Sequence, residues 1–138
     1  MLAIGTLSQR TGVKVPTIRY YEEIGLLAPP GRSAGGQRRY GADDVARLGF
    51  IRHARDLGFG LEAIRSLLDL AAHPDRSCAE ANALAMAQLR DVQARVARLR
   101  RLEGELQRIV AACDGGHPAA ECGVLDALAD HDGCTGPH

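Results

Sequence analysis

The sequence has few aromatic residues and no tryptophan, since its 138 residues include only two Phe and three Tyr. Proteins that bind single-stranded nucleic acid stack the bases on aromatic rings, so a stacking surface of that kind is excluded. No apolar run approaches the roughly 18–20 residues that a membrane helix needs, and the N-terminus lacks the basic start and apolar core of a secretory signal. We therefore expect a cytoplasmic protein with no membrane partner.

Cysteine is missing from residues 1–77, and four cysteines follow, namely Cys78, Cys113, Cys122 and Cys134. In a reducing cytoplasm, cysteines seldom form structural disulfides. They bind metals, take part in redox chemistry or lie buried as small apolar side chains, and their spacing decides among these roles.

Neither sign of charge dominates, because the sequence has 17 basic and 17 acidic residues. The two halves nevertheless differ. Residues 1–60 hold nine Lys/Arg against five Asp/Glu, and residues 61–138 hold eight against twelve. A basic N-terminal half suits a polyanion such as DNA, whereas an acidic C-terminal half does not.

Two short helices are predicted at the N-terminus. Ile4 and Leu7 lie one turn apart in a segment that ends at Gly12, a residue suited to a helix C-terminus. A second helix can begin at Pro16, which the first turn of a helix tolerates, and run to Gly25. Two short helices joined by a tight turn are typical of a helix-turn-helix.

A basic wing and two more helices are predicted next. Residues 28–41 break the helical periodicity and combine glycines with arginines, which indicates the wing. Residues 43–57 begin with two aspartates and then carry apolar side chains at helical spacing, with His53 or Ala54 on the apolar face. A further helix is expected over residues 61–70.

Residues 78–113 predict one long amphipathic helix, because the segment has no proline, its only glycine is Gly104, and Leu, Val and Ile recur at intervals of three and four. Such a helix extends roughly 50 Å, more than the core of one small chain can cover. We expect a second copy to bury its apolar face in a coiled-coil homodimer. Packing against only the chain's own N-terminal helices is the alternative.

A set of short motifs runs through the first 60 residues. It comprises Ile4-Gly5-x-Leu7, Thr17-Ile18-Arg19-Tyr20-Tyr21-Glu22, Gly25-Leu26-Leu27, Arg32, Arg38-Arg39-Tyr40 and Arg55-x-Leu57-Gly58-Phe59. This set resembles the N-terminal signature of the MerR family of transcription regulators, in its metal-responsive branch. The resemblance extends to about residue 128 through the long helix and the loop with cysteines. It implies a homodimer that binds double-stranded promoter DNA and distorts it so that RNA polymerase can use the promoter.

The resemblance also implies two sets of DNA contacts. The set in the major groove is Thr17, Arg19 and Tyr20, and the set on flanking phosphates is Arg32, Arg38 and Tyr40. Arginine can fork to a guanine edge or to phosphate oxygens, and tyrosine carries a hydroxyl on a stiff ring. Packing in the core is the alternative role for a tyrosine, which we expect for Tyr21 and weigh also for Tyr20.

The cysteines predict a metal site shared between two chains. Cys113 and Cys122 flank a short loop after the long helix, and Cys78 precedes that helix, so one chain cannot bring all three together. In an antiparallel dimer Cys78 of one chain meets the other two cysteines of its partner, an arrangement that resembles the divalent-metal sensors of the family. Three thiolates suit Zn²⁺, Cd²⁺, Pb²⁺ or Hg²⁺, and His117 or the Asp114 carboxylate can add a donor.

Other functions stay open beside this one. Mercury sensors of the family also use three cysteines, whereas its Cu(I) sensors are similar in using only the two loop cysteines, so Cys78 argues against copper. A protein that merely buffers metal would need the cysteines but not the wing. A thiol enzyme with Cys122 as nucleophile and His117 as base would lack an orienting third group, so we expect no enzyme.

The predicted fold class is therefore mainly α, and the predicted function is a metal-responsive regulator of efflux or resistance genes. The expected parts are a winged helix-turn-helix DNA-binding domain (1–70), a linker (71–77), a dimerisation helix (78–113), a metal-binding loop with a short helix (114–129) and a flexible tail (130–138). The tail holds His131, Cys134 and His138, which form either a weak metal-collecting group or simply part of a mobile terminus.

Overall fold

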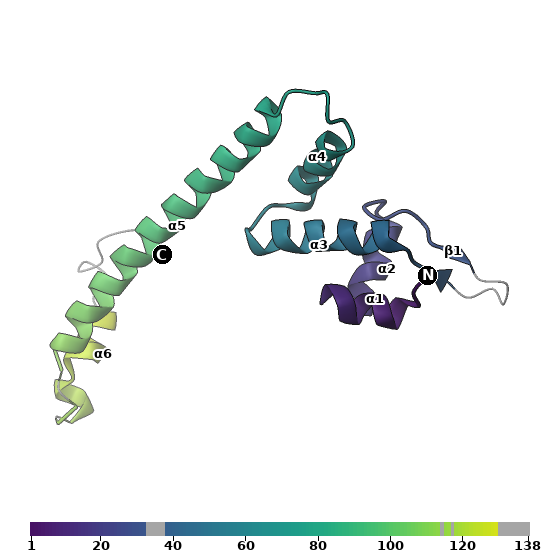
Figure 1. Cartoon of the computed structure of the whole chain (residues 1–138). Helices are drawn as coiled ribbons and strands as arrows, with labels where there is room; N and C mark the ends of the chain where they lie inside the picture. The colour runs from purple at the N-terminus through teal and green to yellow at the C-terminus, as the bar shows by residue number, and fades with distance from the viewer. Residues whose placement is uncertain (33–37, 114, 117, 130–138) are drawn as a thin grey trace. The chain divides into compact units, whose positions relative to one another are not determined.

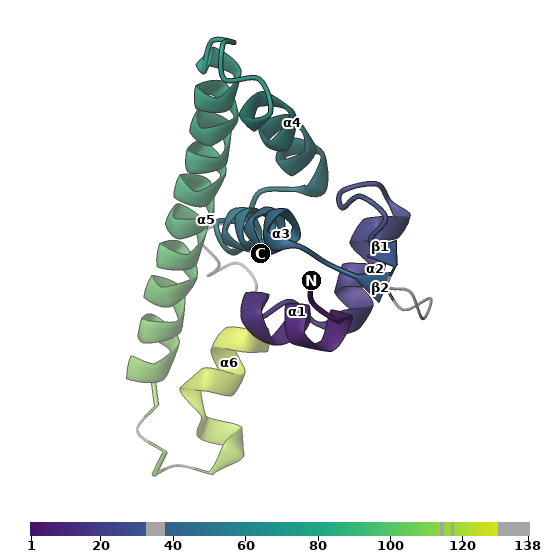
Figure 2. The same cartoon turned by 45° about the vertical axis from the view of Figure 1, so that its right-hand side comes forward.

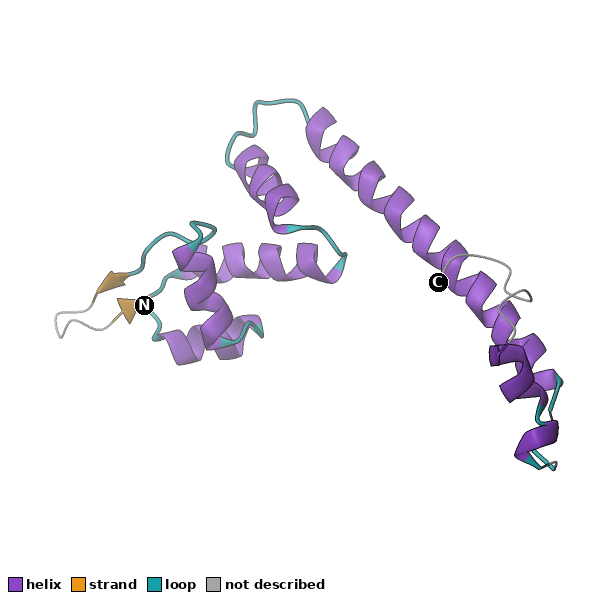
Figure 3. Cartoon of the chain, turned by 180° about the vertical axis from the view of Figure 1, so that it is seen from behind, coloured by secondary structure: helices purple, strands orange, loops and turns teal. Residues whose placement is uncertain are grey.

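The structure is a computed structural model that describes residues 1–32, 38–113, 115–116 and 118–129. It consists of two compact units, 1–84 and 85–138, each described by itself below. Helices account for most of the described residues, which confirms the mainly-α fold class (Figures 1 and 3). The elements are α1 (Ile4–Thr11), α2 (Val15–Glu23), β1 (Gly31–Arg32), β2 (Arg38–Arg39), α3 (Ala42–Asp56), α4 (Leu61–Ala71), α5 (Ala79–Ala111), the 3-10 turn η1 (Ala119–Glu121) and α6 (Gly123–Ala129).

Helices α1 and α2 form the expected helix-turn-helix. Helix α1 ends at Thr11 because Gly12 adopts a left-handed conformation (φ 71°) and donates its N–H to the carbonyl of Ser8 over 2.8 Å. Helix α2 begins at Val15 and accommodates Pro16 in its first turn, where the missing N–H costs nothing. The short turn between them brings the two helices into contact in the first unit (Figure 2).

The wing is a two-stranded antiparallel hairpin. Gly31 pairs with Arg39 and Arg32 pairs with Arg38, and residues 33–37 at its tip lie outside the described residues. The backbone of Tyr40 exchanges hydrogen bonds of 2.7 and 2.8 Å with Leu2. The end of the wing is thus tied to the N-terminus of the chain.

Helices α1 to α4 share one apolar core. Its completely buried side chains come from α1, α2, the segment before the wing, the end of the wing, α3 and α4; they are Leu7, Ile18, Leu26, Leu27, Tyr40, Leu48, Ile51 and Ile64. On α3 the next core position is Ala54 and not His53, which is exposed. The start of α3 is stabilised by Asp44, whose carboxylate accepts the N–H of Gly41 over 2.8 Å.

Two arginines of α3 and α4 close the ends of the first two helices, and a third binds the segment after α2. Arg52 donates to the carbonyl of Thr11 over 2.9 Å, and Arg65 donates to the carbonyl of Ile24 over 2.7 Å. Arg47 donates to the carbonyl of Leu26 over 2.5 Å. Carbonyls at a helix C-terminus have no partner within the helix, and a cation there also opposes the negative end of the helix dipole. The helix-turn-helix is therefore held by charge as well as by the core.

Helix α5 has 33 residues and exposes its apolar face. Leu89, Leu99, Leu106 and Val110 are each more than half exposed, at 55%, 60%, 58% and 66%. A groove along the last turns of the helix is lined by Leu99, Leu102, Leu106 and Val110. A contiguous apolar stripe of this length on a helix calls for a partner surface. Among the described residues, no helix is long and apolar enough to cross a membrane.

Candidate DNA-binding surface and candidate metal centre

Helix α2 separates its side chains into a core face and a solvent face. Ile18 is completely buried and Tyr21 is 7% exposed, so both pack in the core, as predicted for Tyr21. Arg19 is exposed, and Tyr20 is 47% exposed although its ring lies 6.2 Å from that of Tyr21. The helical period thus places a cation and a phenol on the solvent face, and Thr17 is half-buried at its edge. This face suits the reading of base edges in a groove.

The wing supplies further basic residues in the same unit. Arg32 and Arg38 lie opposite each other on the two strands, so they belong to one register position of the hairpin. The structure describes their backbone and not their side chains. Their predicted contacts with phosphate therefore stay predictions.

Tyr40 does not contact phosphate, and this prediction is wrong. The residue is completely buried, because its ring lies in the apolar core. Its hydroxyl donates to Oε1 of Glu22 on α2 over 2.5 Å. A hydrogen bond to a carboxylate is strong, so Tyr40 joins the end of the wing to α2 instead of reaching outwards.

The loop after α5 brings two cysteines together. Cys113 follows the last turn of α5 and Cys122 follows η1, and the thiol of Cys122 donates to Sγ of Cys113 over 3.6 Å. The backbone N–H of Gly115 also donates to Sγ of Cys113, over 3.4 Å. These two interactions, the Gly115 N–H first and the Cys122 thiol second, lower the pKa of Cys113 below the ordinary thiol value, and partial burial opposes them. A lowered pKa favours the thiolate, which is the form that binds metals.

Gly123 permits the return of the chain to the end of α5. A Cβ atom at this position would lie 2.3 Å from the carbonyl oxygen of Ala112, far inside van der Waals contact with backbone that cannot give way. Only glycine allows the approach, which sets Cys122, the preceding residue, beside Cys113.

The spacing of the two sulfur atoms fits a four-coordinate ion. With bonds of about 2.3 Å, two sulfurs on a tetrahedral zinc ion lie about 3.8 Å apart, close to the 3.6 Å between Cys113 and Cys122. A linear two-coordinate ion with bonds of the same length would need sulfurs about 4.6 Å apart. The two sulfurs are therefore close enough to bind one soft or borderline ion together.

Cys78 lies at the other end of α5 and is exposed. It is the residue before the helix, and its carbonyl accepts the N–H of Asn82 over 2.9 Å. Because a helix of 33 residues extends about 50 Å, this thiol cannot join the loop pair of its own chain. Within one chain, the described residues contain no group of three His, Cys, Asp or Glu that could hold a metal.

The remaining candidate ligands fall outside the described residues. These are Asp114 and His117 in the loop and His131, Cys134 and His138 in the tail. Two residues that shape the sites, Glu22 and Gly123, are not among the site residues predicted from the sequence. The bond from Tyr40 to Glu22 spans 18 residues, a separation at which periodicity carries no signal. For Gly123 the only sequence signal was a glycine directly after a loop cysteine.

The fold and these surfaces define a class of protein, a winged helix-turn-helix DNA-binding transcription regulator. Family models confirm it. The model of the MerR helix-turn-helix family regulatory protein matches residues 2–71, and that of the MerR DNA-binding region matches residues 45–109. The chain belongs to the MerR family, which is one of transcription regulators and not of enzymes.

Individual relatives agree with this assignment. The chain is 42% identical over 130 residues to the HTH-type transcriptional regulator ZntR of Escherichia coli K12, covering 93% of this chain and 92% of that protein. It is 39% identical to the mercuric resistance operon regulatory protein of Pseudomonas fluorescens, covering 92% and 87%. It is also similar to the crystal structure of PbrR691 from Ralstonia metallidurans CH34 in complex with lead(II), with a TM-score of 0.79, 40% identity and coverage of 93% and 99%. These relatives confirm the predicted resemblance to the metal-responsive branch.

Proposed function

We propose that this regulator responds to a soft divalent metal ion held by three thiolates from two chains. Cys113 and Cys122 of one chain and Cys78 of its partner are the proposed ligands, with His117 as a fourth donor. The observation that carries the proposal is the pair of loop sulfurs 3.6 Å apart, in which an N–H and a thiol already favour the thiolate of Cys113. Such a pair satisfies half of a tetrahedral site and leaves room for donors from elsewhere.

The partner chain is a second copy of the same protein. The exposed apolar face of α5, with Leu89, Leu99 and Leu106 each more than half exposed, is the surface that an antiparallel coiled coil would bury. Two antiparallel copies also set the N-terminal end of one α5 beside the C-terminal end of the other. Cys78 and the loop pair are then neighbours at each end of the dimer.

The proposed DNA contacts divide between α2 and the wing. Thr17, Arg19 and Tyr20 are proposed to read the major groove, and Arg32 and Arg38 to contact flanking phosphates. Distortion of promoter DNA costs several kcal/mol in elastic estimates, so a metal need shift the dimer by only a few kcal/mol to switch transcription by RNA polymerase. We propose that this switch operates in the cytoplasm.

The choice of metal follows from donor type and spacing. The proposed effector is Zn²⁺, Cd²⁺ or Pb²⁺, and the crystal structure of one relative contains lead(II). Hg²⁺ is the alternative, because another relative is a mercuric resistance operon regulatory protein. Cu(I) is the weaker alternative, because a linear dithiolate would need the Cys113 and Cys122 sulfurs to move apart. Efflux or resistance genes are the proposed targets.

A reporter experiment tests this function. Promoter DNA recovered by selection from random duplexes is placed before a reporter, and cells are exposed in turn to Zn, Cd, Pb, Hg and Cu salts. Divalent ions should induce the reporter, Cys78→Ser should abolish induction without weakening DNA binding, and Cys134→Ser serves as the matched control that should respond normally. Undiminished induction of the Cys78→Ser variant would contradict the three-thiolate site.

Footprinting separates regulation from metal buffering. A regulator should protect a two-fold symmetric promoter site, and added metal should change the distortion of the DNA more than its affinity. Absence of such protection would favour a protein that merely buffers metal.

A further inference from the structure

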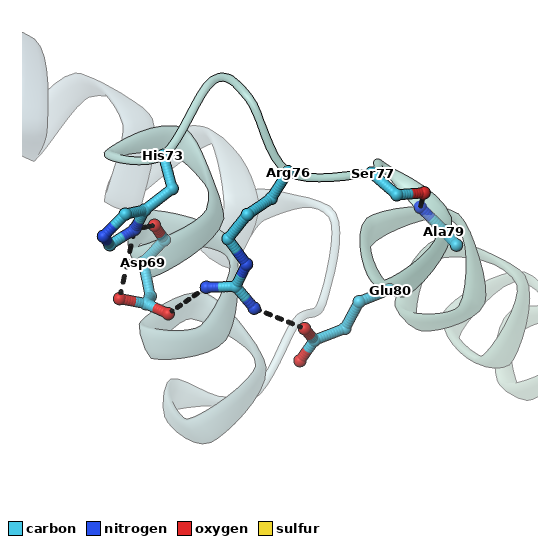
Figure 4. A network of polar contacts seen from close by, with 6 residues as sticks. All are labelled: Asp69, His73, Arg76, Ser77, Ala79 and Glu80. Carbon is cyan, nitrogen blue, oxygen red and sulfur yellow. Dashed lines mark hydrogen bonds and ion pairs between the residues drawn. The ribbon is translucent and has the colours of Figure 1, made fainter.

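A network of polar side chains joins α4 to α5 across the loop that carries Cys78 (Figure 4). Arg76 lies at its centre, with Nη1 3.0 Å from Oδ2 of Asp69 on α4 and Nη2 3.7 Å from Oε2 of Glu80 on α5. His73 adds a 2.8 Å contact from Nδ1 to the backbone carbonyl of Asp69. One guanidinium thus binds the last turn of one helix and the first turn of the next.

The backbone around Cys78 is held on both sides. The hydroxyl of Ser77 accepts the N–H of Ala79 over 3.1 Å, and the carbonyl of Cys78 accepts the first bond within α5, from Asn82. The N–H of Arg76 donates to the carbonyl of His73 over 3.0 Å, which closes the turn before it. Hydrogen bonds thus link the backbone on both sides of Cys78 to the loop that carries Arg76.

Helix α4 continues this connection into the DNA-binding core. Its Ile64 and Leu68 are buried among the core residues, and Arg65 donates to the carbonyl of Ile24 at the end of α2. Side-chain contacts thus run from the Cys78 loop through Asp69 and α4 to the helix proposed to read DNA. All these residues belong to the first unit.

We propose that Arg76 is a positioning residue that couples metal binding at Cys78 to the setting of α4 and α2. The inference rests on the proposed function, in which Cys78 is a ligand. A guanidinium is planar and can hold two carboxylates in a fixed relation, whereas an ammonium is a point charge on a flexible chain. When the ion draws Cys78 towards the loop of the partner chain, Arg76 carries Asp69 and α4 with it. In this proposal the α4–α5 loop is the shared two-state element that such coupling requires.

The test compares Arg76→Gln with Arg95→Gln. Arg95 pairs with Asp91 on the surface of α5 over 3.2 Å, and its side chain is 63% exposed, against 48% for Arg76. The measurements are reporter induction by Zn²⁺ and Pb²⁺, metal affinity by competition with a chromophoric chelator, and DNA affinity without metal. An exposed ion pair is worth at most about a fivefold change in an equilibrium, and Arg76 makes two.

We expect Arg76→Gln to reduce induction by about threefold to tenfold while metal and DNA affinities stay within about twofold of the unmodified protein. Arg76→Lys, which keeps the charge but not the fork, should give intermediate induction, and Arg95→Gln should behave normally. Equal induction in the two Gln variants would overturn the proposal. So would a loss of metal affinity as large as the loss of induction, because Arg76 would then serve the site itself. An unmodified protein that responds to no metal would instead contradict the proposed function.

Discussion

The two units of the chain differ in how far they bury their apolar side chains. In residues 1–84, Leu48, Ile51 and Ile64 are completely buried in a core that the unit builds by itself. Along α5 beyond residue 84, Leu99 and Leu106 are instead 60% and 58% exposed. The core of the first unit is therefore formed within one chain. The second has an apolar face and a cysteine pair that a second copy and a metal ion are proposed to complete.

Substitutions in the core of the first unit should reduce stability the most. Leu48→Ala should lower the free energy of unfolding by about 2–5 kcal/mol, because it leaves a cavity among well-packed side chains. Leu99→Ala on α5 should instead weaken association of two copies by about tenfold or more. Denaturant unfolding and sedimentation measure the two quantities. A Leu99→Ala variant with lower stability but unchanged association would argue that this face packs within one chain.

The next effect concerns the loop. Gly123→Ala should weaken metal binding by about tenfold to a hundredfold, since the added methyl meets the carbonyl of Ala112 and must move Cys122 away from Cys113. Gly104→Ala is the matched control, because nothing lies within 4 Å of a Cβ atom there. The control should keep its metal affinity and gain up to about 1 kcal/mol of helix stability. Chelator competition checks the affinities, and equal affinities would show that the close approach does not hold the site.

A smaller effect is expected where the wing meets α2. Tyr40→Phe removes the hydroxyl that binds Glu22 and keeps the buried ring, which should cost about 1.5 kcal/mol of stability. DNA affinity should fall as well, because the end of the wing loses its hydrogen bond to α2. Tyr21→Phe is the control in the same core. If Tyr40→Phe bound DNA as tightly as this control, the hydrogen bond would have only a structural role.

The smallest expected effect is in the pH dependence of Cys113. Its pKa is lowered by the Gly115 N–H and the Cys122 thiol, so its thiolate persists to lower pH than an ordinary thiol's. Alkylation of Cys113, followed by mass spectrometry, should therefore have its midpoint below that of a free-cysteine peptide. Cys122→Ala removes one cause and should move the midpoint upwards. A midpoint that matches the peptide in the unmodified protein would contradict the thiolate assignment.

Much of the fold followed from local patterns. The helical periods predicted α3, α4 and α5 to within a few residues, and the glycine and proline positions predicted both helices of the helix-turn-helix. The cysteine positions led to the candidate metal site, and the structure brings Cys113 and Cys122 together. Tyr40 was misassigned, because an aromatic residue beside two arginines in a wing has the same local sequence whether its ring points inwards or outwards.

The helices, the division of charge and the family can be predicted from the amino-acid sequence, because each depends on residues that are close along the chain or on motifs read in order. Local patterns do not predict that Tyr40 binds Glu22, that Arg65 closes the end of α2 or that Gly123 approaches Ala112. These contacts join residues on different elements. Their formation depends on how the elements pack, which no local period or propensity encodes.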